Sequence, residues 1–174
     1  YLHDQAGNTR ITNITLYTND IDSDSVNPIA NIEIVEDESF LNYAEFIGFQ
    51  PSPVGLDPET GEFIMIDSPK YRVRLSETGD TKISFSSANS SDVGTGIEKF
   101  TWTVNGDGDN QEIELPASQT DWSYTFRNLT SGSDFIVIEL FVNDASGLQN
   151  SVPTRIFFEV VGELFGDEEP ELMR

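Results

Sequence analysis

The chain has 174 residues, of which 31 are acidic and 9 are basic, so its formal net charge at pH 7 is −22. Small soluble domains usually carry a net charge of about 2 to 8 in magnitude. A surface this acidic repels nucleic acids and anionic membranes, and it favours surroundings in which salt or bound cations screen the charge. The lack of cysteine excludes a disulfide-stapled scaffold and thiol chemistry, and the length suits one domain with appendages.

The first 19 residues repeat, weakly, a pattern found near the end of the chain. A turn at Asp4–Asn8 precedes Thr9–Ile11, as a turn at Asp144–Gly147 precedes Thr154–Ile156, with a spacing that differs by five residues. The β-branched segment 9–18 therefore predicts the closing strand of a β-domain whose other strands are missing here. Such an orphan strand needs a backbone partner. The partner is either the preceding domain of a tandem array or a neighbouring copy that accepts a donated strand.

Residues 20–27 form an acidic linker in which Asp20, Asp22 and Asp24 alternate along the chain. Oxygen ligands gathered in a joint suit Ca²⁺, which binds about six to eight oxygen atoms. The pattern is compatible with a calcium site at this joint, but a solvated polar linker is the favoured interpretation.

The folded domain is predicted to span residues 28–163, with a first strand at 28–34 and an insertion at about 36–69. Within the insertion, apolar residues at helical spacing between the cap Asp37 and the stop Gly48 predict one short helix. Prolines and a glycine interrupt the next stretch, and Glu62–Ile66 predicts a further strand. Residues 164–174 are predicted to be an acidic tail or linker.

From residue 71 onward, apolar and polar residues alternate between turns, and no helical pattern appears. Seven strands are predicted, at residues 71–75, 81–86, 97–104, 111–115, 122–127, 134–142 and 154–161. Strands of this length and spacing are typical of an all-β fold, an antiparallel immunoglobulin-like sandwich of two sheets. Trp102 is the predicted core anchor, with Phe100 and Val104 on the same face. The residues expected to face it from other strands are Phe126, Ile136, Ile138 and Leu140.

Several segments of this region also resemble a known family. They are the small-residue run Ser84–Asp92, the aromatic-x-Trp strand Gly96–Val104, the Gly-Asp-Gly turn at 106–108 and the later turn Asn143–Gly147. Over about residues 70–161 the chain resembles the polycystic-kidney-disease (PKD) type of immunoglobulin-like domain. It departs from the family pattern at Thr103, where Asp is usual, and at Asn105, which adds a residue before the turn. The resemblance implies a building block of adhesins, surface layers or filaments.

A second acidic turn and three acceptor triplets for N-glycosylation are further candidate sites. The turn contains Asp107 and Asp109 and resembles an EF-hand loop, but Asn110 stands where the loop needs Gly and Pro116 where it needs Glu. A hairpin turn is therefore favoured over a second calcium site. The triplets, which point to an extracellular location, begin at Asn13, Asn89 and Asn128.

The sequence offers little for catalysis. His3 is its only histidine, so Ser-His-Asp and Cys-His arrangements are excluded, and no nucleotide-binding motif occurs. Trp122, Tyr124 and Phe126 alternate along one strand and favour buried core over a sugar-binding platform.

These observations predict a non-enzymatic structural or adhesive module of an extracellular multidomain surface protein or filament. Its expected partners are neighbouring immunoglobulin-like domains or identical subunits joined head to tail, with no nucleic acid and no direct membrane insertion. The alternative is an accessory carbohydrate- or protein-binding module of a secreted hydrolase.

Overall fold

The fold is taken from a computed structural model that describes residues 2–3, 9–10, 25–106, 110–127 and 135–161. Its elements are β1 (Leu2–His3), β2 (Thr9–Arg10), β3 (Glu33–Ile34), α1 (Glu38–Tyr43), β4 (Ala44–Leu56), β5 (Phe63–Arg74), β6 (Asp80–Ser86), β7 (Ile97–Asn105), β8 (Gln111–Pro116), β9 (Asp121–Arg127), β10 (Phe135–Asp144) and β11 (Thr154–Val161). Among the described residues no helix is long and apolar enough to cross a membrane.

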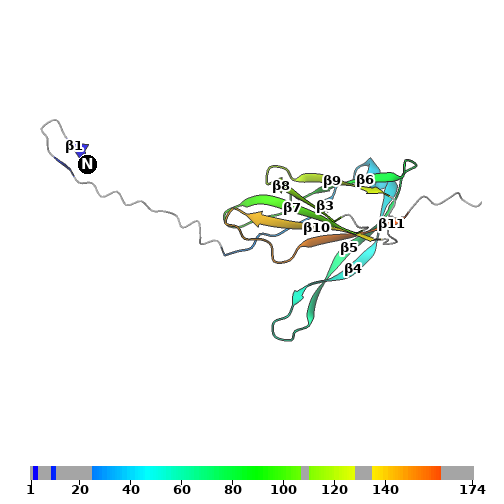
Figure 1. The fold of residues 1–174 in the computed structure, drawn as a ribbon, viewed down its shortest axis with the longest axis horizontal. Coiled ribbons are helices and arrows are strands. Elements are labelled where there is room, and N and C mark those ends of the chain that lie inside the picture. The colour runs from blue at the N-terminus through cyan, green and yellow to red at the C-terminus, as the bar shows by residue number, and fades with distance from the viewer. Residues whose placement is uncertain (1, 4–8, 11–24, 107–109, 128–134, 162–174) are drawn as a thin grey trace, which may run out of the picture.

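Two sheets pack into an immunoglobulin-like β-sandwich, which confirms the predicted all-β fold (Figure 1). The larger sheet has the strand order β4-β5-β11-β10-β7-β8, and the smaller sheet has the order β3-β6-β9. All pairs are antiparallel except β5 and β11, which run parallel from Lys70 opposite Phe157 to Arg74 opposite Val161. The predicted strands from residue 71 onward are all found. Their ends differ from the prediction by at most two residues, with one exception. The segment predicted at 71–75 is the last part of a longer strand, β5.

The core lies between the sheets. It is built from the inward-facing side chains, which alternate with outward-facing ones along each strand. Trp102 is fully buried, as predicted, and its ring lies 5.1 Å from that of Trp122 and 6.1 Å from that of Phe85. Its predicted neighbours are buried as well, namely Phe100, Val104, Phe126, Ile136, Ile138 and Leu140. Phe158 of β11 contacts Phe126 at 4.8 Å and ties the two sheets together.

The insertion contains the predicted short helix. The carboxylate of Asp37 accepts a hydrogen bond from the backbone N–H of Phe40 at 2.9 Å, as expected of an N-cap. The predicted end of the helix was wrong, because α1 stops at Tyr43 and Gly48 lies within β4, at a bulge with φ of +133°. Glycine suits that bulge because it adopts positive φ without a steric penalty.

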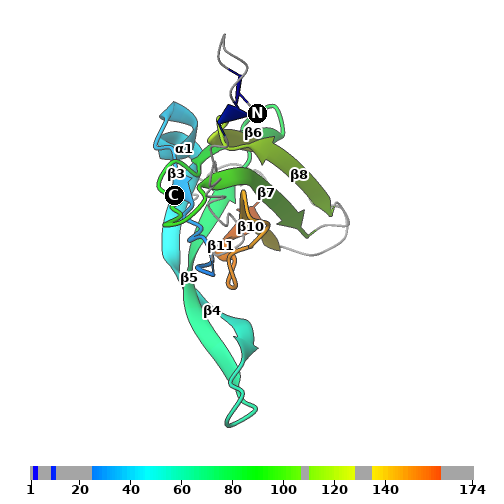
Figure 2. The ribbon, with the colours of Figure 1, turned by 90° about the vertical axis from the view of Figure 1, so that its left-hand side faces the viewer.

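The prolines of the insertion do not break it up, contrary to prediction. β4 runs through Pro51 and Pro53, pairs with β5 along its length and forms a long two-stranded ribbon that projects from the sandwich (Figure 2). β4 is the edge strand of its sheet. An edge strand tolerates proline because the missing N–H would otherwise point away from the sheet.

The N-terminal predictions are only partly covered by the described residues. β2 pairs with β1 in antiparallel register, Leu2 opposite Arg10, whereas residues 11–18 of the predicted orphan strand lie outside the described part. The predicted first strand at 28–34 is shorter than expected. It consists of β3 and an isolated bridge between Ile29 and Ser91.

Candidate functional site

The β4–β5 ribbon is the most distinctive feature that the sandwich presents to its surroundings. Only the last part of β5, from Lys70 to Arg74, pairs with β11. The rest of the ribbon continues beyond this pairing and ends in the turn Asp57–Glu62 (Figure 2). The carboxylate of Asp57 accepts hydrogen bonds from the backbone N–H groups of Glu59 at 2.8 Å and Thr60 at 3.3 Å, and these bonds lower the pKa of Asp57. This turn folds the two strands back on each other.

One face of the ribbon is almost entirely apolar. The inner face of β5 carries the odd-numbered residues, since Tyr71 stacks on the core residue Phe158 and Val73 is fully buried. Following that face outward leads to side chains that are at least half exposed. They form what we call the apolar stripe: Phe46 (51% exposed), Phe49 (64%), Leu56 (57%), Phe63 (68%) and Met65 (51%).

The apolar stripe is continuous with the core. Phe46 contacts Tyr71 with ring centroids 5.5 Å apart and contacts Phe49 at 5.2 Å, both edge to face. Further out, Met65 pairs with Pro53 and Phe63 pairs with Leu56. Cross-strand neighbours lie on the same face of a ribbon. The stripe is therefore the inner face of the large sheet, continued past the point where the small sheet covers it.

The other face of the sheet at the base of the ribbon carries paired charges. Arg72 donates to Glu159 through Nε at 3.1 Å and Nη2 at 3.0 Å, and to Glu45 through Nη1 at 3.2 Å. Lys70 also contacts Glu159, at 3.4 Å, and Arg155 donates to Glu139. Burial raises the pKa of Glu159, but the hydrogen bonds and charges of Arg72 and Lys70 outweigh it, so that the pKa is lowered overall. The basic side chains here are neutralised by carboxylates of the chain itself.

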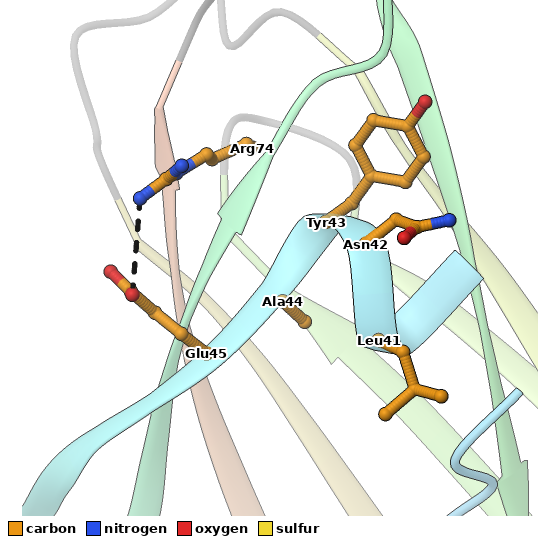
Figure 3. Close-up of a pocket in the computed structure, with 6 residues that line it drawn as sticks. All are labelled: Leu41, Asn42, Tyr43, Ala44, Glu45 and Arg74. Carbon is orange, nitrogen blue, oxygen red and sulfur yellow. Dashed lines mark ion pairs between the residues drawn. The ribbon is translucent and has the colours of Figure 1, made fainter. Parts of the chain in front are cut away.

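A shallow pocket lies where α1 meets the ribbon (Figure 3). It has a volume of about 190 Å³ and is lined by Leu41, Asn42, Tyr43, Ala44, Glu45 and Arg74. The ion pair between Arg74 Nη2 and Glu45 at 3.9 Å closes one side of it. Pockets for drug-sized ligands measure about 300 to 1,000 Å³, so this pocket suits only a small group.

A second hollow, of about 300 Å³, lies over the outer face of β7, β8 and β10. It is an open and largely polar surface, with Thr101, Thr103 and Phe141 in its floor, and the ion pair between Lys99 and Glu114 forms part of its lining. The hydroxyl of Thr103 in this hollow donates a hydrogen bond to the carboxylate of Glu139 at 3.2 Å, which links the outer faces of β7 and β10.

The two ends of the sandwich are where the chain enters and leaves. At the entry end the hydroxyl of Thr154 donates to the carbonyl of Ala30 at 2.7 Å, beside the start of β11. At the exit end the N–H of Leu75 donates to the carbonyl of Val161 at 3.2 Å, beside the last residue of β11. The eight residues of β11 span about 26 Å. Entry and exit therefore lie at opposite ends of the sandwich.

Two aspartates that were predicted only as parts of a turn and of a small-residue run, and not as site residues, organise turns at the entry end. Asp144 is fully buried, and its Oδ1 accepts bonds from Ser146 N at 2.9 Å, Ser146 Oγ at 2.8 Å and Leu148 N at 2.7 Å. Asp92 Oδ2 likewise accepts from Gly96 N at 2.6 Å. The second oxygen of each carboxylate is buried without a hydrogen-bond partner from the described residues. Both aspartates close a turn through bonds to backbone N–H groups.

Most of the predicted site residues lie outside the described part of the chain, namely Asp20, Asp22, Asp24, Asp107, Asp109, Asn13 and Asn128. Asn89 is described; it is exposed, and its side-chain amide donates to Glu33. In the described ranges no three His, Cys, Asp or Glu side chains form a group that could hold a metal. The preference for core over a sugar platform agrees with β9, where Phe126 is buried and Trp122 and Tyr124 pack against the core.

Comparison with known proteins adds no family assignment. No protein-family model matches the chain, and no curated protein matches it either. Any proposal for the function of the chain therefore rests on the fold and the surfaces described above.

Proposed function

We propose that the chain is a non-enzymatic structural or adhesive module of an extracellular multidomain surface protein or filament, of the PKD-like type that the sequence resembles. The observation that supports this most directly is that the chain enters and leaves the sandwich at opposite ends, beside Ala30 and beside Val161. Modules with this arrangement join end to end through short linkers without reversing the chain. Tension applied along such an array passes along each sandwich.

The proposal includes a head-to-tail contact made by residues 9–18, which would donate a strand to a neighbouring copy. A strand acceptor needs a regular, unblocked edge. Among the described strands β9 fits this best, because it is the edge of the small sheet, pairs with β6 without a bulge and contains no proline. Calcium bound by Asp20, Asp22 and Asp24 would hold the joint at a fixed angle.

Sedimentation velocity of the full chain tests this function. Head-to-tail contacts do not close, so we expect a series of oligomers that lengthens with protein concentration. Deleting residues 1–19 should leave a folded protein that no longer forms this lengthening series, whereas deleting the acidic residues 164–174 should leave the series intact. Identical oligomers with and without residues 1–19 would refute strand donation.

The calcium part of the proposal has its own test. At matched ionic strength, Ca²⁺ should raise the melting temperature of the full chain relative to chelator, because a ligand that binds only the folded state stabilises it. Replacing Asp20, Asp22 and Asp24 together by Asn should remove this difference. Equal melting temperatures with calcium and with chelator would exclude the site.

The accessory-module alternative has a separate test. Retention of the protein on an insoluble polysaccharide would favour that alternative.

A further inference from the structure

We infer that the apolar stripe of the β4–β5 ribbon docks face to face on the same stripe of a second copy, giving a lateral dimer with twofold symmetry. This contact is separate from the proposed end-to-end function, because it uses the ribbon and requires neither residues 1–19 nor calcium. A twofold contact uses one surface of each copy and closes on itself. Its product is a dimer of fixed size.

The ribbon is suited to docking through its face and poorly suited to docking through its edge. Pro51 and Pro53 lack the N–H that an added strand would need, and the bulges at Ile47 and Val54 disturb the register of β4. Docking through the apolar face needs no backbone pairing, because contact is made by side chains of both strands, Phe46, Phe49 and Leu56 on β4 and Phe63 and Met65 on β5. Face-to-face packing of sheets is how such apolar surfaces are normally covered.

The area of the stripe matches what a specific dimer needs. Its five side chains are 51 to 68% exposed, and residues of this size expose roughly 150 to 250 Å² when free. Together they present about 500 Å² of apolar surface, which equals the largest patch of a typical monomer, about 300 to 600 Å². Two copies would bury about 1,000 Å² through these side chains, the lower bound of a specific interface.

The charge of the chain argues against an anionic membrane or a nucleic acid as the partner, and the apolar stripe itself indicates a partner with a similar apolar face. The ribbon ends in the acidic residues Asp57, Glu59 and Glu62, and the whole chain carries −22, so it would be repelled by anionic membranes and nucleic acids. The second copy is a partner that certainly presents a matching stripe. Among the described residues of β4 and β5 that share the face of the stripe, the one charged side chain is Asp67, opposite Pro51.

This charge distribution predicts how the dimer responds to salt. Two copies that each carry −22 repel one another, and salt screens that repulsion over about 8 Å at 0.15 M and about 3 Å at 1 M. Dimerisation should therefore strengthen as salt is raised. Replacing Asp67 by Asn should strengthen it further, because the carboxylate no longer has to be buried or faced by its symmetry mate.

Sedimentation equilibrium of the full chain at 0.15 M and 1 M NaCl tests the inference. We expect self-association that strengthens with salt and that retains a closed dimer when residues 1–19 are deleted. The dissociation constant of this dimer should be at least about tenfold weaker for the double variant Phe49→Ser/Phe63→Ser and tighter for Asp67→Asn. Val93→Ser is the matched control, because Val93 is 82% exposed but belongs to the loop between β6 and β7 and not to the ribbon. The control should dimerise like the unmodified protein.

Three outcomes would overturn the inference. They are a monomer at all salt concentrations, a Phe49→Ser/Phe63→Ser variant that dimerises as tightly as the control, and dimers that vanish when residues 1–19 are deleted while the stripe variants are unaffected. The last outcome would leave the end-to-end function standing. Conversely, closed dimers that persist after that deletion would support the stripe even if strand donation failed. Melting curves of both variants check that each is folded.

Discussion

Replacing Trp102 by Ala is the most direct perturbation of the core. The side chain is fully buried at the centre of β7, between the rings of Trp122 at 5.1 Å and Phe85 at 6.1 Å. Truncation of a buried tryptophan removes its burial energy and leaves a cavity between the sheets, at a cost of about 3 to 5 kcal/mol. Domains have total stabilities of about 5 to 15 kcal/mol, so the variant should be close to unfolding at moderate temperature.

Trp102→Phe separates packing from polarity at the same position. The Nε1 atom of Trp102 is buried without a hydrogen-bond acceptor among the described residues, and an unsatisfied buried donor costs about 1 to 3 kcal/mol. Phenylalanine keeps a ring and removes this donor. We therefore expect Trp102→Phe to lower the free energy of unfolding by much less than Trp102→Ala does.

Urea denaturation followed by far-UV circular dichroism measures both variants on one scale. A loss below about 1 kcal/mol for Trp102→Ala would refute the assignment of this residue as the core anchor. Equal losses for the two variants would show that the indole N–H makes a favourable interaction, contrary to the reasoning above.

Three further predictions concern single residues. Gly106→Ala should destabilise the fold by more than Gly79→Ala, because both have positive φ but only at Gly106 would the new Cβ clash with the backbone oxygen of Phe135 in β10. Equal urea midpoints for the two variants would contradict this. Asp144→Ala should cost about 2 to 3 kcal/mol, since three hydrogen bonds to a buried carboxylate are lost, whereas a neutral effect would contradict the role of this residue in its turn. The lowered pKa of Glu159 means that its pairing with Arg72 stabilises the fold above the unfolded pKa of about 4.3 and is lost as pH falls through the lower folded value. Glu159→Gln should therefore lose less stability between pH 5 and about pH 3 than the unmodified chain, as measured by melting temperature.

The elements that the sequence predicted well are those whose signals are local. Strands such as Asp80–Ser86 and Ile97–Asn105 alternate apolar and polar residues between turns, so their type and inward face can be read without knowing their partners. The N-cap Asp37 is equally local, because its carboxylate bonds to a backbone group three residues away. The core position of Trp102 follows from the same alternation.

The pairing of β5 with β11 is not a local property. Lys70 and Phe157 are opposite each other although 87 residues separate them in the sequence. A short apolar run looks the same whether its neighbour is parallel or antiparallel. The sequence predicted separate strands at 62–66 and 71–75, and only the register with β11 and β4 shows that they belong to one strand, Phe63–Arg74.

The sequence of the ribbon contains two features that are typical of an edge hairpin. Pro51 and Pro53 are two residues apart, so on an edge strand both missing N–H groups point the same way, out of the sheet. The segment Asp57–Gly61 has the Asp, Pro and Gly typical of a hairpin turn. Together with the strand expected at 62–66, these features are compatible with a hairpin. Prolines in a strand count against it unless the edge position is known, so the sequence alone predicts an interruption here.

The exposure of the apolar stripe has a topological cause. The small sheet has three strands and the large sheet has six, so the small sheet cannot cover the full inner face of its partner. β3 ends at Ile34, and the chain then forms α1 and the ribbon before β5 returns to pair with β11. Tyr71 and Val73 reach the core, whereas Phe63 and Met65 on the same face of the same strand do not. An apolar face that continues past the sheet that covers it, interrupted on β5 by Asp67, indicates a surface that another molecule covers, which is why the ribbon, and not either of the two hollows, is the place to look for a partner.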